Sequence, residues 1–330
     1  MEPVWNPKLP KGANFIRAKF LWEIGLHIAG NPATPYYGNR DICITVGSGS
    51  GDKYKPWLRM SCGSPILAHA VARGELEAAI VNPSAMLTQA VRGKGLFGTP
   101  LPLCIIANYP SWDRFVFAAH PRLGLKSLAD VKARRLPVRI STREDKTHST
   151  RDLINQVLGV YGYSMQDVES WGGSLQLNGG PGDARRLKAI GEGSVDIVMD
   201  EGLALWLEHA LAAGYQPLTL EPEVFKKLGE IGWRRVVMPK GQYRGLEADH
   251  ACIDYSAWPL YARTDLPDDD AYKIVDAIAA RQDEIVWEEF NAWAPFKGIG
   301  ALGEETDATP RDVPLHPGAA RWFREHGYKV

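Results

Sequence analysis

Apolar residues follow two different periods along this chain of 330 residues, and the two periods alternate from one end to the other. Short, nearly continuous apolar runs predict buried strands, and they occur at residues 41–46, 78–81, 103–107, 115–119, 136–140 and 195–199. Between these runs, apolar positions recur three and four residues apart and stop at a glycine, as at Gly74, Gly159 and Gly214, which is typical of helices. Strands that alternate with helices predict an α/β fold with doubly wound, mostly parallel sheets.

The expected helix starts are marked by small polar or acidic residues. Asn14 is the expected N-cap of the first helix, Ser64 of the second, and either Ser149 or Thr150 of a third. Acidic residues 268–270 suit the positive N-terminus of a long helix near the end of the chain.

Residues 47–60 begin with the letters GSGSG and interrupt this alternation. The glycine run lacks the Lys-Ser/Thr pair of a P-loop and the third glycine of a dinucleotide fingerprint. We therefore expect a flexible, lid-like loop at residues 47–51 and no phosphate site.

Charge and cysteine content exclude several classes of protein. A formal net charge of -1 leaves no basic surface for nucleic acid, and no apolar run approaches the ~20 residues of a membrane span, so we expect neither partner. The four cysteines, Cys43, Cys62, Cys104 and Cys252, lack the spacing of a disulfide framework or a zinc site. We expect no metal and no cofactor.

The N-terminal segment has no apolar h-region of the kind found in secretory signal peptides. The protein is therefore expected in the cytoplasm if Met1 is the native start, and in the periplasm if an upstream signal peptide was removed.

Five stretches carry a resemblance to a known family. They are Gly63-Ser64 with residues 73–81, GLKSLADVKARRLPV at 124–138, residues 195–201, MPKGQYRG at 238–245, and LHPGAARWFREHG at 315–327. In this order the stretches resemble the TAXI family, which are the solute-binding proteins of TRAP transporters within the type II periplasmic-binding-protein superfamily.

The resemblance implies two lobes joined by two crossover strands, with a ligand in the cleft between the lobes. It places lobe one at residues 1–114 and 256–330 and lobe two at residues 115–255, with crossovers near 115–119 and 253–262. Residues 141–150 depart from the short Gly-Ser-Gly-Thr-like turn of the family, so the identity of the ligand does not carry over.

Small and polar residues at predicted strand ends and helix starts are the candidate ligand-binding residues. In open α/β sheets a ligand lies at the carboxyl ends of the strands, where helix N-termini present unpaired N–H groups. The candidates are Ser61, Ser64, Asn82, Ser84 and Asn108 from lobe one, and Arg143, His148, Ser149, Thr150, Trp171, Asp200 and Glu201 from lobe two.

Each candidate also has a purely structural interpretation. Ser64 and Asp200 suit helix caps, Asn82 precedes a proline in a turn, and Trp171 suits a core position. His148 is the one histidine selected as a possible acid or base, because its neighbours place it in the charged loop between a strand and a helix.

The sequence and the resemblance together predict a protein that binds a small organic acid, with an aromatic carboxylate favoured by the Trp and Tyr residues near the cleft. If exported, it would deliver this solute to TRAP membrane subunits. The alternative is a cytoplasmic enzyme on the same fold, decarboxylase- or hydrolase-like, acting on a small aromatic or carboxylic acid with His148 as its acid or base. A cytoplasmic ligand sensor is a third possibility.

Overall fold

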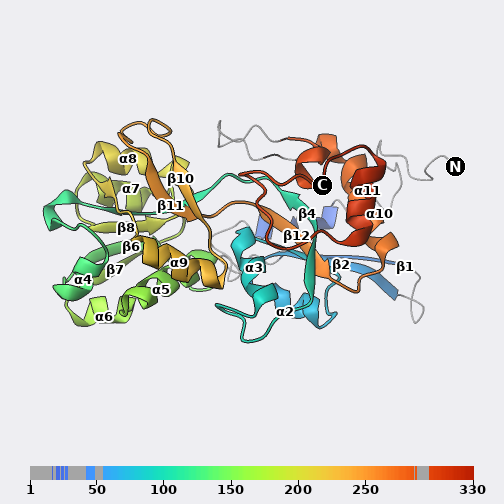
Figure 1. The fold of residues 1–330 in the computed structure, drawn as a ribbon, viewed down its shortest axis with the longest axis horizontal. Coiled ribbons are helices and arrows are strands. Elements are labelled where there is room, and N and C mark those ends of the chain that lie inside the picture. The colour runs from blue at the N-terminus through green and yellow to red at the C-terminus, as the bar shows by residue number, and fades with distance from the viewer. Residues whose placement is uncertain are drawn as a thin grey trace.

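The computed structural model describes residues 42–48, 55–285, 287 and 297–330, together with residues 17, 20–22, 24–25 and 27–28. The described residues between 17 and 28 are helical, as predicted, whereas Asn14 and residues 49–51 of the expected lid lie outside the described part. The chain forms two lobes, each built on one mixed sheet (Figure 1). This confirms the predicted two-lobed α/β class.

Lobe one is built on a five-stranded sheet with the strand order β1-β2-β3-β12-β4. Its strands are β1 (Ile42–Ser48), β2 (Lys55–Gly63), β3 (Ala78–Val81), β12 (Trp258–Arg263) and β4 (Leu103–Tyr109). Strands β2 and β3 are parallel, and the other neighbours are antiparallel.

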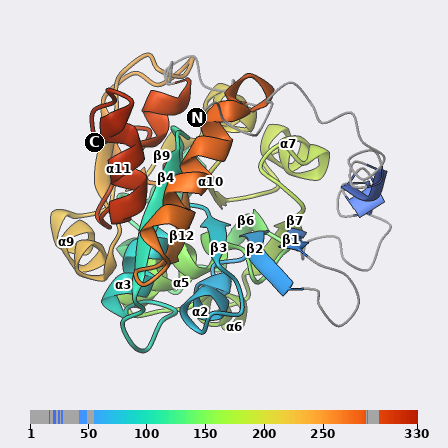
Figure 2. The same cartoon turned by 90° about the vertical axis from the view of Figure 1, so that its right-hand side faces the viewer.

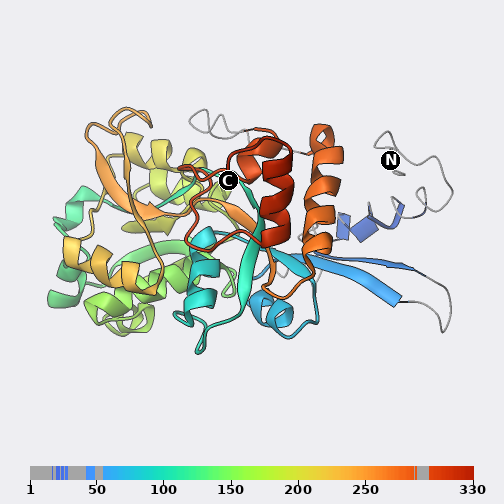
Figure 3. The ribbon, with the colours of Figure 1, turned by 45° about the vertical axis from the view of Figure 1, so that its right-hand side comes forward.

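Helices cover both faces of this sheet. They are α2 (Leu67–Ala72), α3 (Ser84–Arg92), α10 (Asp268–Ala280) and α11 (Pro317–Glu325). Figures 2 and 3 show α10 and α11 side by side on one face, with α2 and α3 toward the other. The alternation of side chains along β3 explains the two cores, because Ala78 packs with the α10–α11 side and Ala79 with the α2–α3 side.

Lobe two is built on a second sheet with the order β10-β11-β5-β8-β6-β7, and β9 pairs with β5 outside this path. Its strands are β5 (Arg114–Ala119), β6 (Arg139–Arg143), β7 (Ser174–Asn178), β8 (Ile197–Asp200), β9 (Gln216–Pro217), β10 (Arg235–Met238) and β11 (His250–Asp254). Strands β8, β6 and β7 are parallel, so their carboxyl ends meet at one edge of the sheet.

Helices again lie on both faces. They are α4 (Ala129–Ala133), α5 (Ser149–Tyr161), α6 (Met165–Ser170), α7 (Ala184–Gly191), α8 (Leu207–Ala212) and α9 (Pro222–Ile231). Helices α7 and α8 pack on the opposite face from α4, α5 and α6 (Figure 1). Short 3₁₀ turns lie at Pro121–Leu123, Leu203–Leu205, Gln282–Glu284 and Ile299–Leu302.

Three sequence-based expectations differ from the structure. The sheets are mixed and not mostly parallel, because β12 and β5 run antiparallel to their neighbours. The expected loop is wrong at residues 47–48, which end strand β1, and the strand Lys55–Gly63, which pairs with β1 and β3, was not predicted. The strand expected at 136–140 begins three residues later, at Arg139.

The chain leaves the first sheet after β4 and returns to it between β11 and β12. The exact lobe boundaries at residues 114–115 and 255–256 stay a prediction. Within the described residues, no helix combines the length and the apolar character that crossing a bilayer requires.

Candidate functional site

The strand ends of the two lobes meet at one place. In lobe one, β3 is followed by Asn82 and the N-terminus of α3, and in lobe two β6 is followed by a short loop and the N-terminus of α5. The Ser149 hydroxyl at the start of α5 donates a hydrogen bond to the Asn82 carbonyl at 2.8 Å. Because that proton is used, the Tyr255 hydroxyl, 2.6 Å away, donates to Ser149 Oγ. We call the residues Asn82, Arg143, His148, Ser149 and Glu201 the strand-end site.

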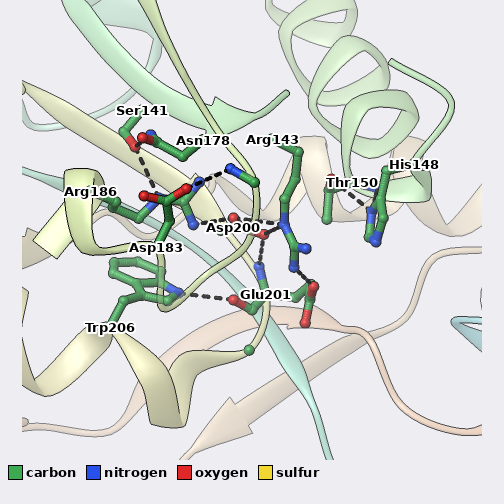
Figure 4. Close-up of polar contacts among 12 residues, drawn as sticks. Ser141, Arg143, His148, Thr150, Asn178, Asp183, Arg186, Asp200, Glu201 and Trp206 are labelled. Carbon is green, nitrogen blue, oxygen red and sulfur yellow. Dashed lines mark hydrogen bonds and ion pairs between the residues drawn. The ribbon is translucent and has the colours of Figure 1, made fainter. Parts of the chain in front are cut away.

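Four charged side chains form a buried cluster at the lobe-two edge of this site (Figure 4). Arg143 Nε donates to both carboxylate oxygens of Asp200, at 2.9 and 3.0 Å, and Arg143 Nη2 contacts the Glu201 carboxylate. Arg186, which is fully buried, also contacts Asp200. We call Arg143, Arg186, Asp200 and Glu201 the charge cluster, and its two positive and two negative charges cancel.

The fold places these residues through sheet register. Strands β6 and β8 are parallel neighbours that pair Ser141 with Val198, so the chain ends bearing Arg143 and Asp200 lie side by side. In the same way β7 pairs Asn178 with Arg143, and the Asn178 amide donates to Ser141 Oγ at 2.8 Å. Arg186 reaches the cluster from α7 and donates from Nε to the same Ser141 oxygen at 3.0 Å.

The backbone after β8 is held on both sides. The Glu201 N–H donates to Asp200 Oδ1 at 2.9 Å, and the Glu201 carbonyl accepts from Trp206 Nε1 at 2.9 Å (Figure 4). Gly202 follows with φ of 63°, where a side chain would be strained and would meet Pro181, and its N–H donates to Asp113. The chain direction at Glu201 is therefore fixed.

His148, and neither Ser149 nor Thr150, is the N-cap of α5. Its Nδ1 accepts the Thr150 N–H at 3.2 Å and lies 3.0 Å from Thr150 Oγ1 (Figure 4). The predicted cap is wrong because the Ser149 hydroxyl turns to Asn82 and Tyr255 instead. With Nδ1 accepting, a neutral His148 carries its proton on Nε2. Thr150 is completely buried.

The lobe-one candidates differ in where they lie and in what their side chains contact. Ser84 donates to the Ser256 carbonyl at 3.0 Å, and Asn108 donates from Nδ2 to the Pro310 carbonyl at 3.1 Å. The side-chain oxygens of Asn82 and Asn108 are buried without a partner among the described residues. Ser61 donates to the Ile42 carbonyl at 3.1 Å within the sheet, while Ser64 Oγ accepts the Ile66 N–H at 3.4 Å. The last two therefore have local partners near β2 and α2.

Trp171 lies apart from the strand-end site. It follows α6 and lines a hollow of about 470 Å³ together with Lys132, Arg135, Tyr161 and Tyr163. Figure 1 places α4 and α6 at the outer end of lobe two, away from lobe one. The structure thus pairs Arg143 with Glu201, and Ser149 with Asn82, but does not bring Trp171 to them.

Two residues of this region escaped the sequence analysis. Tyr255 is fully buried, and burial raises the pKa of its phenol well above the usual range, so the hydroxyl remains a donor. Arg186 was missed because arginine is normally expected in solvent. Its spacing of four residues from the buried Ile190 on α7 was the available signal.

A second network links the lobes beside the crossovers. Arg114 Nη1 lies 2.9 Å from Asp254 Oδ1, and its guanidinium lies 3.8 Å from the centre of the Trp112 ring. Arg234 Nε bonds the other Asp254 oxygen at 2.9 Å and its terminal nitrogens contact Ser84 and Asp312 of lobe one. These contacts hold lobe two against the N-terminus of α3.

A model of the NMT1-like family matches residues 58–327. Among solved structures, XAC2383 from Xanthomonas citri bound to chloride ion is 11% identical, covers 79% of this chain and 78% of that chain, and has a TM-score of 0.38. Lactococcal OpuAC complexed with glycine betaine is 10% identical over 79% and 81%, with a TM-score of 0.36. A periplasmic transporter of known structure is 14% identical over 97% of this chain and 90% of that chain, with a TM-score of 0.35.

Proposed function

Because the chain belongs to the NMT1-like family, we propose that it is a solute-binding protein that holds a small organic acid between its lobes. We propose further that it is of the TAXI type, with an aromatic carboxylate as the favoured ligand and residues 1–114 with 256–330 facing residues 115–255. In an exported form, it would work in the periplasm and deliver the solute to TRAP membrane subunits.

The observation that carries this proposal is the 2.8 Å hydrogen bond from Ser149 to the Asn82 carbonyl. It joins the N-terminus of a thirteen-residue helix in lobe two to a strand end in lobe one. The helix N-terminus favours an anionic ligand, because its N–H groups and dipole carry partial positive charge, and strand ends are where ligands of α/β proteins lie. Two such features from different lobes at one place support a ligand seat there.

Polar chemistry at the same place supports an acid as the ligand. Arg143 supplies a buried guanidinium that can pair with a carboxylate. The buried Asn82 Oδ1 has no partner among the described residues, which is rare in native proteins. A hydroxyl of the solute, or a water held beside it, would satisfy this oxygen.

The proposal is tested by a thermal-shift screen of the purified chain against benzoate, phthalate, succinate, glutamate and cyclohexanecarboxylate. Hits are titrated calorimetrically, and the recovered solute is examined by chromatography. We expect micromolar binding of at least one carboxylate and recovery of the unchanged compound. The absence of any binding at millimolar concentration contradicts the proposal. Conversion of the solute into a product supports the enzyme alternative instead.

Asn82→Ala localises the binding. We expect affinity for the hit to fall three- to tenfold, as for the loss of about 1 kcal/mol of hydrogen bonding. The free energy of unfolding should hardly change, because Asn82 Oδ1 has no partner to lose among the described residues. Asn155→Ala, on the exposed surface of α5, is the matched control and should leave affinity unaltered.

A further inference from the structure

We propose that Glu201 occupies, in the ligand-free protein, the position on Arg143 that the carboxylate of the solute takes, so that binding is an exchange of one carboxylate for another. This inference rests on the proposed function and adds two points to it. It identifies the recognised chemical group as a carboxylate, and it makes Glu201 a specificity-determining residue.

The Arg143 guanidinium is shared by two carboxylates, which bind different nitrogens. Asp200 holds Nε through both of its oxygens, and Glu201 holds Nη2 (Figure 4). A carboxylate binds arginine best through two parallel hydrogen bonds. The free end of this guanidinium offers such a pair through Nη1 and Nη2 only after Glu201 has left Nη2.

The two acids differ in how firmly they are held. The Asp200 side chain is completely buried and is also bonded by Arg186 and by the Glu201 N–H. The Glu201 carboxylate has Arg143 as its one ion-pair partner within the described residues, and its side chain is 11% exposed. Asp200 is therefore a fixed part of the fold, and Glu201 is the acid that can exchange.

The exchange needs only a side-chain rotation. The Glu201 N–H and carbonyl are both bonded, to Asp200 and to Trp206, so the backbone stays in place. The side chain has rotatable bonds and an opening to solvent, which together allow the displaced carboxylate to be hydrated.

The ion pair between Arg143 and Glu201 also affects which solutes can bind. Arg143 is 10% exposed, and an uncompensated charge at that depth is strongly unfavourable. A neutral solute cannot replace the Glu201 charge, whereas a carboxylate can, so the internal pair excludes neutral compounds of the same shape. The same pair lowers the affinity for the correct ligand, because each binding event must first break it.

The test compares Glu201→Gln with wild type, using benzoate as the probe and calorimetry as the readout. We expect benzoate to bind at least tenfold more tightly to the variant, because the internal competitor has lost its charge. Glu208→Gln is the matched control, since it makes the same charge change on α8, where Glu208 pairs with the exposed Arg244, and should alter affinity less than twofold.

A second measurement keeps the test independent of any folding defect. Arg143→Lys removes the guanidinium fork but keeps the charge, and it is introduced into both backgrounds. We expect this change to cost more benzoate affinity in the Glu201→Gln background than in wild type, because only there does benzoate meet the open fork without a competitor. Benzamide, the neutral isostere, should not bind wild type, and any binding of it to Glu201→Gln should be weaker than that of benzoate, because only benzoate compensates the charge of Arg143.

The outcomes separate this inference from the proposed function. Equal or weaker benzoate binding by Glu201→Gln, with wild type still binding, overturns the exchange and leaves the solute-binding function intact. Failure of both proteins to bind any carboxylate of the panel overturns both. Binding of benzylamine by wild type that is lost in Glu201→Gln overturns the exchange in favour of a cationic solute held by Glu201.

Discussion

The two lobes share one architecture but bury different kinds of polar side chain. Among the described residues, the buried polar side chains on the first sheet and the segments around it include no Asp, Glu, Lys or Arg, and they are Ser61, Ser84, Thr88, Gln89, Asn108, Ser111, Ser256, Thr309 and His316. Lobe two, counted from the first residue of its strand β5, buries charged side chains, namely Arg114, Arg143, Arg186, Asp196, Asp200, Glu201 and Asp254. The buried polar side chains of lobe one are thus neutral hydrogen-bonding groups, whereas those of lobe two include ion pairs.

This difference bears on how a solute would be recognised. A neutral acceptor such as Asn82 Oδ1 can orient a ligand but cannot select its charge. The charge cluster of lobe two can select charge, because the removal of one member leaves an opposite charge uncompensated. Under the proposed function, lobe two sets the class of solute and lobe one sets its orientation.

The largest effect is expected from Asp200→Asn in the charge cluster. Asp200 pairs with both Arg143 and Arg186, so the change leaves two buried guanidiniums with one remaining carboxylate. We expect the free energy of unfolding, measured with urea, to fall by about 3 to 5 kcal/mol. Asn108→Ala in lobe one, which removes one neutral bond, should cost only about 1 kcal/mol. Equal losses would contradict the contrast between the lobes.

The next effect is a pH dependence located in lobe two. His250 is buried on β11, with Nδ1 3.3 Å from Thr219 Oγ1, and burial lowers its pKa to about 4. The unfolded chain has the ordinary value near 6.5, so it binds the proton first as pH falls. The stability from neutral His250 is therefore present above about pH 6.5 and is lost progressively between pH 6.5 and 4.

His250→Gln isolates this contribution, because glutamine does not titrate. We expect wild type to lose about 2 to 3 kcal/mol more than the variant between pH 7 and pH 4, measured by urea unfolding at each pH. If the free energy of unfolding falls with pH by the same amount in the two proteins, the acid sensitivity does not come from His250. The pH dependence would then not be located at this buried side chain of lobe two.

Much of the fold was accessible from local sequence pattern. The strand Ala78–Val81 has the predicted bounds, because its short apolar run lies between Gly74 and Pro83, which limit its length on both sides. Helix α5 was predicted from the apolar spacing of Leu153, Val157 and their neighbours. By contrast, β2 was missed because Trp57 and Arg59 follow a glycine run, and its pairing with β1 and β3 depends on residues far along the chain.

The candidate site was predictable in place but not in chemistry. Arg143, Ser149 and Glu201 stand at strand ends and helix starts, which local pattern identifies. That Arg143 is neutralised by Asp200 and Glu201 depends on a contact between segments 57 residues apart, formed through the register of β6 and β8. Sequence reasoning therefore treated Arg143 as an open cation, and the structure shows it already paired.

The smallest effect is expected at Arg135, which sharpens the comparison because it is a charge of lobe two that is exposed and unpaired. Its side chain has no hydrogen bond or ion pair to any described residue, and its φ of 46° lies in the left-handed region that disfavours side chains. Arg135→Gly should raise the free energy of unfolding by about 1 kcal/mol, because glycine adopts this conformation without strain. Arg134→Gly is the contrasting variant, since the φ of Arg134 is an ordinary -99° and its Nη1 donates a hydrogen bond to the Leu123 carbonyl at 3.0 Å, so this change should instead cost about 1 to 2 kcal/mol. If Arg135→Gly lowers the free energy of unfolding as much as Arg134→Gly does, then an exposed, unpaired arginine stabilises lobe two. Burial and ion pairing would then not be what makes a charged side chain of lobe two important for stability.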